Sequence, residues 1–474
     1  MGFSLHDEIR VRESERMKAK VIAAIMMMLF LANILVVTIP VHASNTFVVS
    51  PSGGDDTDKI QNAFDLAVEA GPGSIVELEA GTFYLSRPIV VVNFDGHFKG
   101  ASKDVTIVQD FGHGPFPLTE PPLEPMPCLF AFYQNANGDP SPHIKFSDMT
   151  IRATGKSVPW SWHGYPPIHL FGHLVRVYGK VTGVEDFEVS YVSTSIERMG
   201  FKGKVDPSSP IGFSVANGFQ VSGENIWELG TKGLESLLFK YTKPLTGTHT
   251  IADSSFRKMG GSCPFVGLED STVEVKGNTF DNVLYAFEIY DFSDTVAKFS
   301  QNNVENVHWC GVYAAQAEQS VLGLDFGPQG PLPELSTVLV SDNTIHCIEF
   351  ADGVVLRDYA PMAGETKRLD ATISRNTIIL DNTWYGGIFG FYAQDVKVKE
   401  NYITGTGFAG IYMGVSEDLC AGWKIIGNDV EEVIAWIAPI WLGPGTSDCL
   451  VVGRGDTYVW DEGTDNKLVN VNEM

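Results

Sequence analysis

The stretch Val396-Lys-Val-Lys-Glu-Asn401-Tyr-Ile403 decides the fold, because close variants of it recur along the second half of the chain. Each variant has an alternating apolar and polar segment, then an asparagine, then a second apolar segment. Alternation with a period of two is typical of a β-strand. The asparagines are Asn278, Asn302, Asn343, Asn376, Asn401 and Asn428, and Ser254 occupies the same place in a degenerate copy.

The spacing of the repeat predicts strands wound into stacked coils. The asparagines follow one another at steps of 24, 41, 33, 25 and 27 residues. One coil cannot bury its apolar side chains alone, whereas coils stacked about 4.8 Å apart pair their backbones and align equivalent side chains. We therefore expect the asparagines to be inward-facing turn residues that hydrogen-bond to neighbouring coils as a ladder.

One helix is expected ahead of the strands, over residues 57–70. Ile60, Phe64 and Ala67 fall at helical spacing, and Gly71-Pro-Gly73 ends the helix. The open end of a stack of coils exposes sheet edges that must be covered. The amphipathic helix lies where such a cap is needed.

The segment from Asp55 to Leu85, which ends in Gly81-Thr-Phe-Tyr-Leu85, resembles the entry of pectate-lyase-like proteins, and the later Asn-Thr-Ile and Gly-Ile-Tyr rhythm is similar to their repeat. The resemblance implies an all-β fold, a right-handed parallel β-helix (solenoid) with a short N-terminal capping helix. It implies one continuous domain from residue 44, with the helical cap and first coils over 44–100 and further coils with loop insertions over 101–474. That superfamily includes polysaccharide lyases, glycoside hydrolases and adhesins, so the fold does not settle the activity.

Residues 1–43 are typical of an N-terminal extension and a signal peptide. A nearly unbroken apolar run from Ile22 to Pro40 follows Lys18 and Lys20, and small residues precede a cut after Ala43. We expect export, to the periplasm, the cell surface or the medium. The alternative is an uncleaved membrane anchor, since the run is long enough to span a bilayer.

The charge balance bears on the partners of the protein. The chain has 58 Asp and Glu against 33 Lys and Arg, which gives a net charge of −25 at pH 7. This disfavours nucleic-acid binding, which needs a basic surface. It also disfavours polyanions unless a divalent cation bridges. Calcium needs several oxygen ligands, and the carboxyl groups near Asp291, Asp294 and Asp358 are the candidates. The alternative is that they are solvated carboxylates of turns, since no spacing marks a calcium site.

The six cysteines include no Cys-x-x-Cys motif. Cys420 and Cys449 precede aligned strands in successive coils, so we expect them to lie close enough for a disulfide.

The third strand of each coil is expected to present alternate side chains outward. The first outward column is Glu288, Tyr313, Val355, Phe389, Tyr412 and Trp441, and a second column contains Tyr290, Ala315, Arg357 and Phe391. An outward stripe of aromatic residues is typical of a binding surface, and flat rings suit pyranose sugars. If loops cover the stripe, it is instead a satellite of the core.

The two columns supply the candidate site residues. Tyr290, Tyr313, Phe389, Tyr412 and Trp441 are predicted to bind substrate, and Glu288, Arg357, Asp291 and Asp358 are the catalytic candidates. Desolvation among aromatic rings raises the pKa of a glutamate, as a general acid needs. An arginine suits a carboxylate ligand. The alternative for Glu288 and Arg357 is a structural ion pair or two unrelated charges.

The resemblance and the aromatic stripe together favour an exported carbohydrate-active protein. The favoured activity is that of a polysaccharide lyase or glycoside hydrolase, with an extracellular glycan bound in a groove along the coils. The alternative is a non-catalytic surface or adhesin-type protein that binds glycan in the same groove. Carboxyl groups in the groove discriminate between them, because hydrolases need two and a binder needs none.

Overall fold

The protein divides into two compact units, Met1–Asn45 and Thr46–Met474. The computed structural model describes residues 45–110, 129–133, 143–153, 158–160, 168–170, 175–178, 180–191, 219–222, 224–229, 237–243, 245–266, 268–290, 292–316, 334–348, 350–415 and 419–474. The expected signal peptide lies outside these residues. Within them, no helix is both long and apolar enough to cross a membrane.

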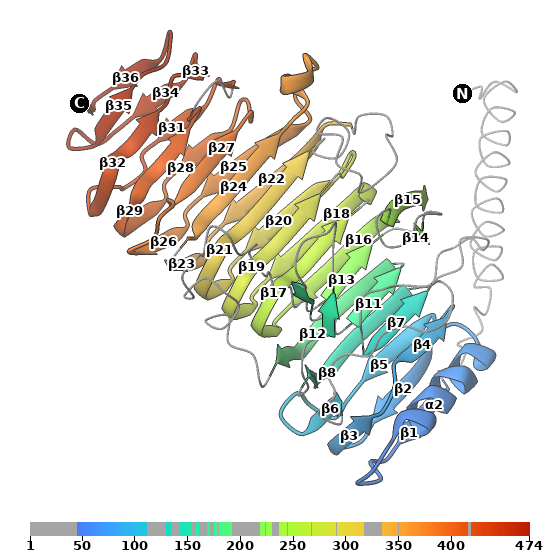
Figure 1. Cartoon of the computed structure of the whole chain (residues 1–474). Helices are drawn as coiled ribbons and strands as arrows, with labels where there is room; N and C mark the ends of the chain where they lie inside the picture. Colours follow the sequence, from blue (N-terminus) through green and yellow to red (C-terminus); the bar gives the residue numbers. More distant parts are fainter. Residues whose placement is uncertain are drawn as a thin grey trace, which may run out of the picture. The chain divides into compact units, whose positions relative to one another are not determined.

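Parallel strands wind through the second unit in coils, and each strand pairs with its counterparts in the coils before and after it (Figure 1). The strands that precede the six anchor asparagines form one column with their counterparts in the neighbouring coils. Its members are β16 (Leu245–Ala252), β18 (Leu268–Lys276), β20 (Val296–Ser300), β22 (Ser336–Ser341), β25 (Leu369–Ser374), β28 (Lys397–Lys399), β31 (Lys424–Ile426), β34 (Leu450–Val452) and β36 (Lys467–Val469). The predicted repeat is therefore confirmed as a stack of parallel pairs.

The strands that follow the asparagines form the remaining columns of the stack. The second column contains β17 (Ser255–Val266), β19 (Thr279–Tyr290), β21 (Asn303–Gln316), β23 (Thr344–Ile348), β26 (Thr377–Asp381) and β29 (Tyr402–Met413). The third contains β24 (Asp352–Asp358), β27 (Ile388–Phe391), β32 (Val433–Leu442), β35 (Tyr458–Asp461) and β37 (Asn472–Glu473). Because β19, β21 and β29 are long, their later residues belong to the third column.

The N-terminal coils continue the same parallel pairing. They contain β1 (Thr46–Val49), β2 (Ser74–Leu78), β3 (Gly81–Leu85), β4 (Ile89–Val92), β5 (Gly96–Lys99), β6 (Thr106–Asp110), β7 (Phe130–Tyr133), β8 (His143–Ala153), β11 (Val175–Tyr178), β12 (Lys180–Tyr191) and β13 (Phe219–Ser222). Two antiparallel pairs are β9 (Val158–Trp160) with β10 (Ile168–Leu170), and β14 (Glu224–Leu229) with β15 (Leu237–Lys243). The short strands β30 (Cys420–Ala421) and β33 (Thr446–Ser447) pair in parallel.

The asparagine ladder is confirmed. All six anchor asparagines are buried. The Oδ1 atom of Asn401 accepts hydrogen bonds from the backbone N–H and the Nδ2 of Asn376 at 3.0 and 2.9 Å, and its own Nδ2 donates to the carbonyl of Ile373 at 3.0 Å. Asn428 accepts from Asn401 in the same way. The buried backbone groups at each turn are thus satisfied by the next coil, which is why this position requires an amide side chain.

The residue before each anchor adopts a left-handed backbone conformation. It is glycine at positions 277 and 427, but φ is also +59° at Asp342, +54° at Arg375 and +57° at Glu400. Such angles are costly for residues with a Cβ atom. The asparagine that follows each of these residues stabilises the turn, because its hydrogen bonds to the neighbouring coils require the left-handed conformation.

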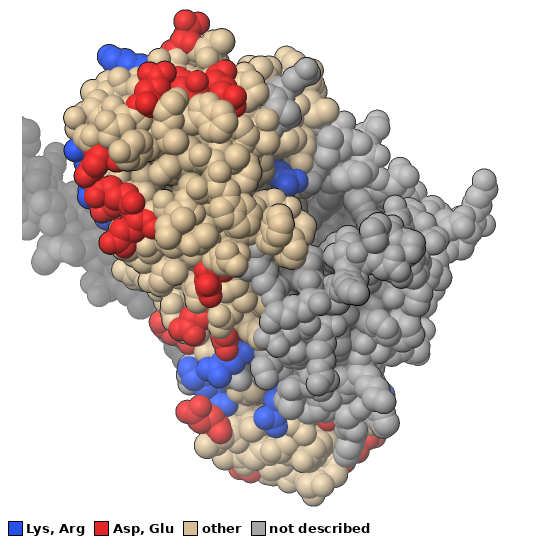
Figure 2. Space-filling model, turned by 60° about the vertical axis from the view of Figure 1, so that its left-hand side comes forward, with Lys and Arg blue, Asp and Glu red and all other residues tan. Residues whose placement is uncertain are grey.

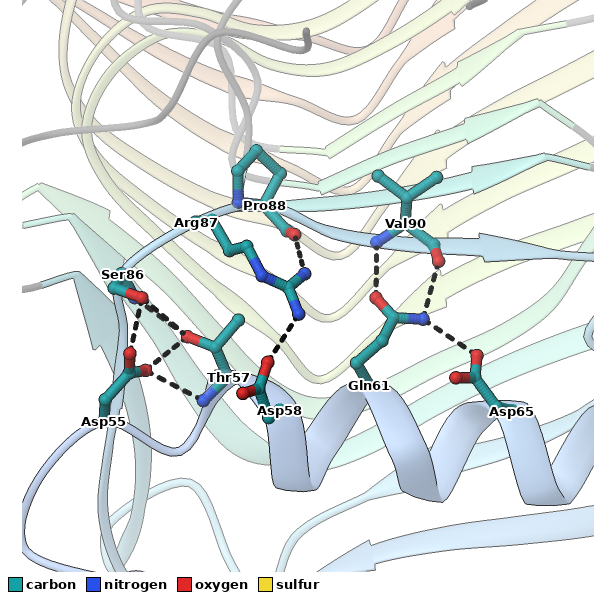
Figure 3. A network of polar contacts seen from close by, with 9 residues as sticks. All are labelled: Asp55, Thr57, Asp58, Gln61, Asp65, Ser86, Arg87, Pro88 and Val90. Atoms are coloured by element: carbon teal, nitrogen blue, oxygen red, sulfur yellow. Dashed lines mark hydrogen bonds and ion pairs between the residues drawn. The ribbon is translucent and has the colours of Figure 1, made fainter. Parts of the chain in front are cut away.

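The helix α2 (Thr57–Ala70) has the predicted bounds and caps the first coils. Phe64 is fully buried, and its ring meets those of Phe94, Phe98 and Phe132 at centroid distances of 5.2, 4.9 and 5.5 Å. On its polar side, the amide of Gln61 makes two hydrogen bonds with the backbone of Val90 (Figure 3). The helix therefore covers the aromatic core at the open end.

The predicted disulfide is not formed. Cys420 and Cys449 are both buried free thiols. The Sγ atom of Cys449 lies 4.0 Å from the carbonyl oxygen of Cys420, so the residues are neighbours. However, Cys420 pairs with Thr446 in the strand register, three residues before Cys449, and its own Sγ faces the carbonyl of Gly390. The two cysteines lie in neighbouring coils, but they are offset by three residues in the strand register, and this offset separates their sulfur atoms.

Candidate functional site

The strand register of the third column confirms the two columns of residues predicted from the sequence. Glu288 pairs with Tyr313, which pairs with Val355, and the series continues through Phe389, Tyr412 and Trp441. The second outward column, from Tyr290 through Ala315 and Arg357 to Phe391, is aligned as predicted. Stacking has therefore aligned, in one column, side chains that are 23 to 42 residues apart in the sequence.

A pocket of about 350 Å³ lies on this stripe. Strands β21, β24, β27 and β29 supply its walls, with further residues from the corners between strands. Its lining residues are Trp309, Tyr313, Phe350, Asp352, Val355, Arg357, Trp384, Tyr385, Phe389, Phe391, Phe408, Tyr412 and Val415. Among the described residues, the lining is dominated by aromatic rings and contains one carboxyl group and one guanidinium group.

The stripe is more covered than the sequence predicts. Tyr313 and Tyr412 are buried except where they face the pocket, and Phe389 stacks on Tyr412 with ring centroids 4.6 Å apart. Trp441 does not line the pocket. Its ring packs against Phe408, and its indole N–H donates to Glu462 at 3.0 Å. The stripe is thus partly a satellite of the core and partly the lining of a pocket, because its aromatic residues pack in small clusters around that pocket.

Asp352 is the carboxyl group among the described residues of the pocket lining, and it was not among the residues predicted from the sequence. Only 6% of Asp352 is exposed. Its Oδ1 atom accepts hydrogen bonds from the backbone N–H of Gly386 at 2.9 Å and from the hydroxyl of Tyr412 at 2.8 Å. Burial raises the pKa of Asp352 to about 7, although these two hydrogen bonds and the charge of Arg357 act in the opposite direction. The group therefore changes its protonation state near neutral pH.

Glycine at position 386 is required for the contact between Asp352 and Tyr412. A Cβ atom at Gly386 would lie 2.4 Å from the carbonyl oxygen of Ala409 and 2.7 Å from Cε1 of Tyr412. Without a side chain there, the Tyr412 ring passes over the chain and its hydroxyl reaches Asp352, which is 60 residues away in the sequence.

Arg357 lies against two aromatic rings in the pocket. Its guanidinium carbon is 5.2 Å from the centroid of Tyr313 and 5.6 Å from that of Phe391, both within the range of a cation–π interaction. Its Nη1 atom donates to the hydroxyl of Tyr359 at 3.2 Å. The side chain is thus held in place along the wall, as a fixed source of N–H donors for a ligand.

Glu288 is one coil away from the pocket wall. It is 7% exposed and is not part of the lining. The hydroxyl of Tyr290 donates to it at 2.5 Å, and burial raises its pKa to about 7. Tyr313, its neighbour in the register, has its ring 5.2 Å from that of Tyr290. Glu288 and Arg357 thus stand beside the same tyrosine.

Asp358, one of the catalytic candidates from the sequence, is surrounded by backbone donors. It is fully buried, and its carboxylate accepts hydrogen bonds from the backbone N–H groups of Ala360, Arg368 and Leu369 at 3.2, 2.6 and 2.9 Å. It therefore fixes the loop that follows β24. Asp291, the remaining candidate, lies outside the described residues. Among the residues that are described, no group of three or more His, Cys, Asp or Glu side chains is placed to hold a metal ion.

No protein-family model matches the sequence, and no curated protein matches it significantly. Solved structures do resemble the fold. DFA-IIIase from Arthrobacter chlorophenolicus A6 in complex with GF2 superposes with a TM-score of 0.52 and 11% identity, over 86% of this chain and 94% of that chain. The same enzyme without its lid gives a TM-score of 0.51 and 11% identity, over 87% and 94%. At this identity the likeness establishes a shared fold.

Proposed function

We propose that the protein is an exported glycoside hydrolase that binds a neutral glycan in the aromatic pocket. The observation that carries the proposal is the pocket lining itself, in which aromatic walls enclose the carboxyl group of Asp352, with a pKa of about 7, and the guanidinium of Arg357. Aromatic faces suit the apolar faces of sugar rings, and the polar groups suit their hydroxyls. The fold likeness to DFA-IIIase, whose ligands GF2 and DFA-III are carbohydrates, supports the same class of ligand.

Hydrolysis of a neutral glycan is favoured over elimination on a uronic-acid polymer. The net charge of −25 repels polyanions. On the face drawn in Figure 2, acidic side chains gather at the upper end and along one border, and the described surface between them is largely uncharged. A neutral glycan meets no such repulsion, and Arg357 then serves as a hydrogen-bond donor to sugar hydroxyls.

The proposed catalytic roles follow from the environment of each carboxyl group. Asp352 lines the pocket and is protonated below pH 7, so it can donate a proton to the glycosidic oxygen as general acid. Hydrolases hold a second carboxyl group roughly 5–9.5 Å from the first. Glu288 lies two coils from Asp352 and three residues further along the strand direction. At the spacings of parallel strands this puts their Cα atoms about 14 Å apart, so we leave the second carboxyl group unassigned.

We also propose a fold family and a route of export for the protein. The stacked parallel coils and the capping helix support a right-handed parallel β-helix of the pectate-lyase-like kind. The apolar run from Ile22 to Pro40, with small residues before Ser44, supports export by a cleaved signal peptide.

A non-catalytic glycan-binding protein is the second candidate. The observation in its favour is that Asp352 is the only carboxyl group among the described residues of the pocket lining. A binder would use the aromatic walls and Arg357 and would need no second carboxyl group.

Replacing Phe389 by alanine tests the pocket as the glycan site. Phe389 is partly exposed to the pocket and stacks on Tyr412, so its loss removes a flat wall from the site. We expect the affinity for neutral oligosaccharides, measured by calorimetric titration, to fall about tenfold, which is about 1.4 kcal/mol. Tyr402→Ala is the matched control, since Tyr402 is an exposed aromatic residue at the start of β29 and outside the pocket. Unchanged affinity in Phe389→Ala would place the glycan elsewhere.

A further inference from the structure

Three aromatic residues lie together beside the pocket, and two of them are exposed. Trp384 is 62% exposed and Trp436 is 46% exposed, whereas most large aromatic residues of the described chain are buried or partly buried. The ring of Trp384 lies parallel to that of Phe350 at 6.2 Å and meets the ring of Trp436 edge-on at 5.2 Å. Phe350, Trp384 and Trp436 are called the aromatic ridge below.

The coil between Trp384 and Trp436 has a glycine at position 407. Gly407 lies opposite Trp384, because the neighbours of Trp384 bond to Thr406 and Phe408, and it pairs with Ala435 on the other side. A Cβ atom at Gly407 would come within 2.8 Å of the carbonyl oxygen of Tyr385. Gly407 therefore lies between Trp384 in one coil and Ala435, the residue before Trp436, in the next.

The ridge is continuous with the pocket. Phe350 and Trp384 line the pocket, and Trp436 does not. A ligand that leaves the pocket over Trp384 therefore meets Trp436 next. The ridge is made of apolar rings only, so it offers no charge for an anionic ligand. A contiguous exposed apolar surface of this kind is typical of a binding site.

We propose that the aromatic ridge is a second glycan subsite, and hence that the substrate is a neutral oligosaccharide or polysaccharide chain longer than the pocket. This inference rests on the proposed function of the pocket. The sugar units in the pocket contact Tyr313, Phe389 and Tyr412, and the following units of the same chain pass over Trp384 and contact Trp436.

The test compares a disaccharide with a hexasaccharide of the same neutral glycan, by calorimetric titration of the full chain. Trp436→Ala is expected to leave the dissociation constant for the disaccharide within twofold of the wild-type value and to raise that for the hexasaccharide about tenfold. Trp436→Phe, which keeps an aromatic face, is expected to restore most of the affinity. Tyr402→Ala, at an exposed aromatic residue away from the ridge, is expected to change neither constant.

The outcomes separate the inference from the proposed function. If the wild type binds disaccharide and hexasaccharide equally and Trp436→Ala has no effect, the ridge is not a subsite but the pocket still binds glycan. Equal losses for both ligands in Trp436→Ala, or a loss of the same size in Tyr402→Ala, would also overturn the inference. If the wild type binds neither ligand, the proposed function itself fails. A change in self-association of Trp436→Ala, with unchanged glycan affinity, would identify the ridge as a protein contact instead.

Discussion

Replacing Asp352 by asparagine is expected to lower kcat on a neutral glycan by about 10²–10⁴-fold, the usual contribution of a general acid. The asparagine retains an Oδ1 atom that can accept from the N–H of Gly386 and from the hydroxyl of Tyr412, so the pocket keeps its shape. The variant loses only the proton that the carboxyl group donates. We therefore expect glycan affinity to remain within a few fold of the wild-type value while turnover is lost.

The pH dependence gives this prediction a second readout. Burial raises the pKa of Asp352 to about 7, so the acid is protonated below that pH and ionised above it. The kcat/KM of the wild type should fall about tenfold for each pH unit above 7, and the residual activity of Asp352→Asn should lack this fall. The control is Asp110→Asn, at a buried aspartate of β6 in the N-terminal coils. Full turnover in Asp352→Asn would contradict the assignment.

Replacing Asn401 by leucine is expected to lower the free energy of unfolding by about 2–6 kcal/mol. The leucine fills a similar volume but leaves the backbone N–H of Asn376 and the carbonyl of Ile373 without the hydrogen bonds that Asn401 makes to them. Each buried polar group left unsatisfied costs about 1–3 kcal/mol. Denaturant unfolding measures the loss, and hydrogen exchange should show faster exchange at the amide of Asn376.

The matched control for the ladder is Asn303→Leu. Asn303 follows an anchor directly, but its side chain lies at the surface and bonds to Glu305. We expect this variant to unfold within about 0.5 kcal/mol of the wild type, as surface substitutions usually do. An equal loss in both variants, or an amide of Asn376 that stays protected in Asn401→Leu, would show that the ladder does not hold the coils together.

The sequence predicted the fold where the pattern is periodic. The asparagine spacing located the turns, the alternation in the third strand predicted the pairing of Phe389 with Tyr412, and the apolar spacing gave the helix over 57–70. These features follow from backbone geometry, which repeats in every coil.

The candidate site was less predictable because much of it comes from the corners between strands. Trp309 and Trp384 lie where insertions break the period, so no alignment brings them together. Asp352 occupies the first position of β24, in a column with Tyr285 and Cys310. It is the one charged residue among these three, and that difference could have identified Asp352 as a candidate site residue. The environment of Asp358 depends on backbone donors in a loop, which sequence spacing does not reveal.

The most direct test of the central claim is the product formed when the purified protein is incubated with a panel of neutral and uronic-acid glycans, with and without calcium. The account predicts new reducing ends from a neutral glycan, without a need for calcium and without absorbance from an unsaturated uronide. Absorbance from an unsaturated uronide would show elimination and contradict the hydrolase assignment. Binding of neutral glycans with no product at any pH between 5 and 8 would show that the pocket binds without catalysis.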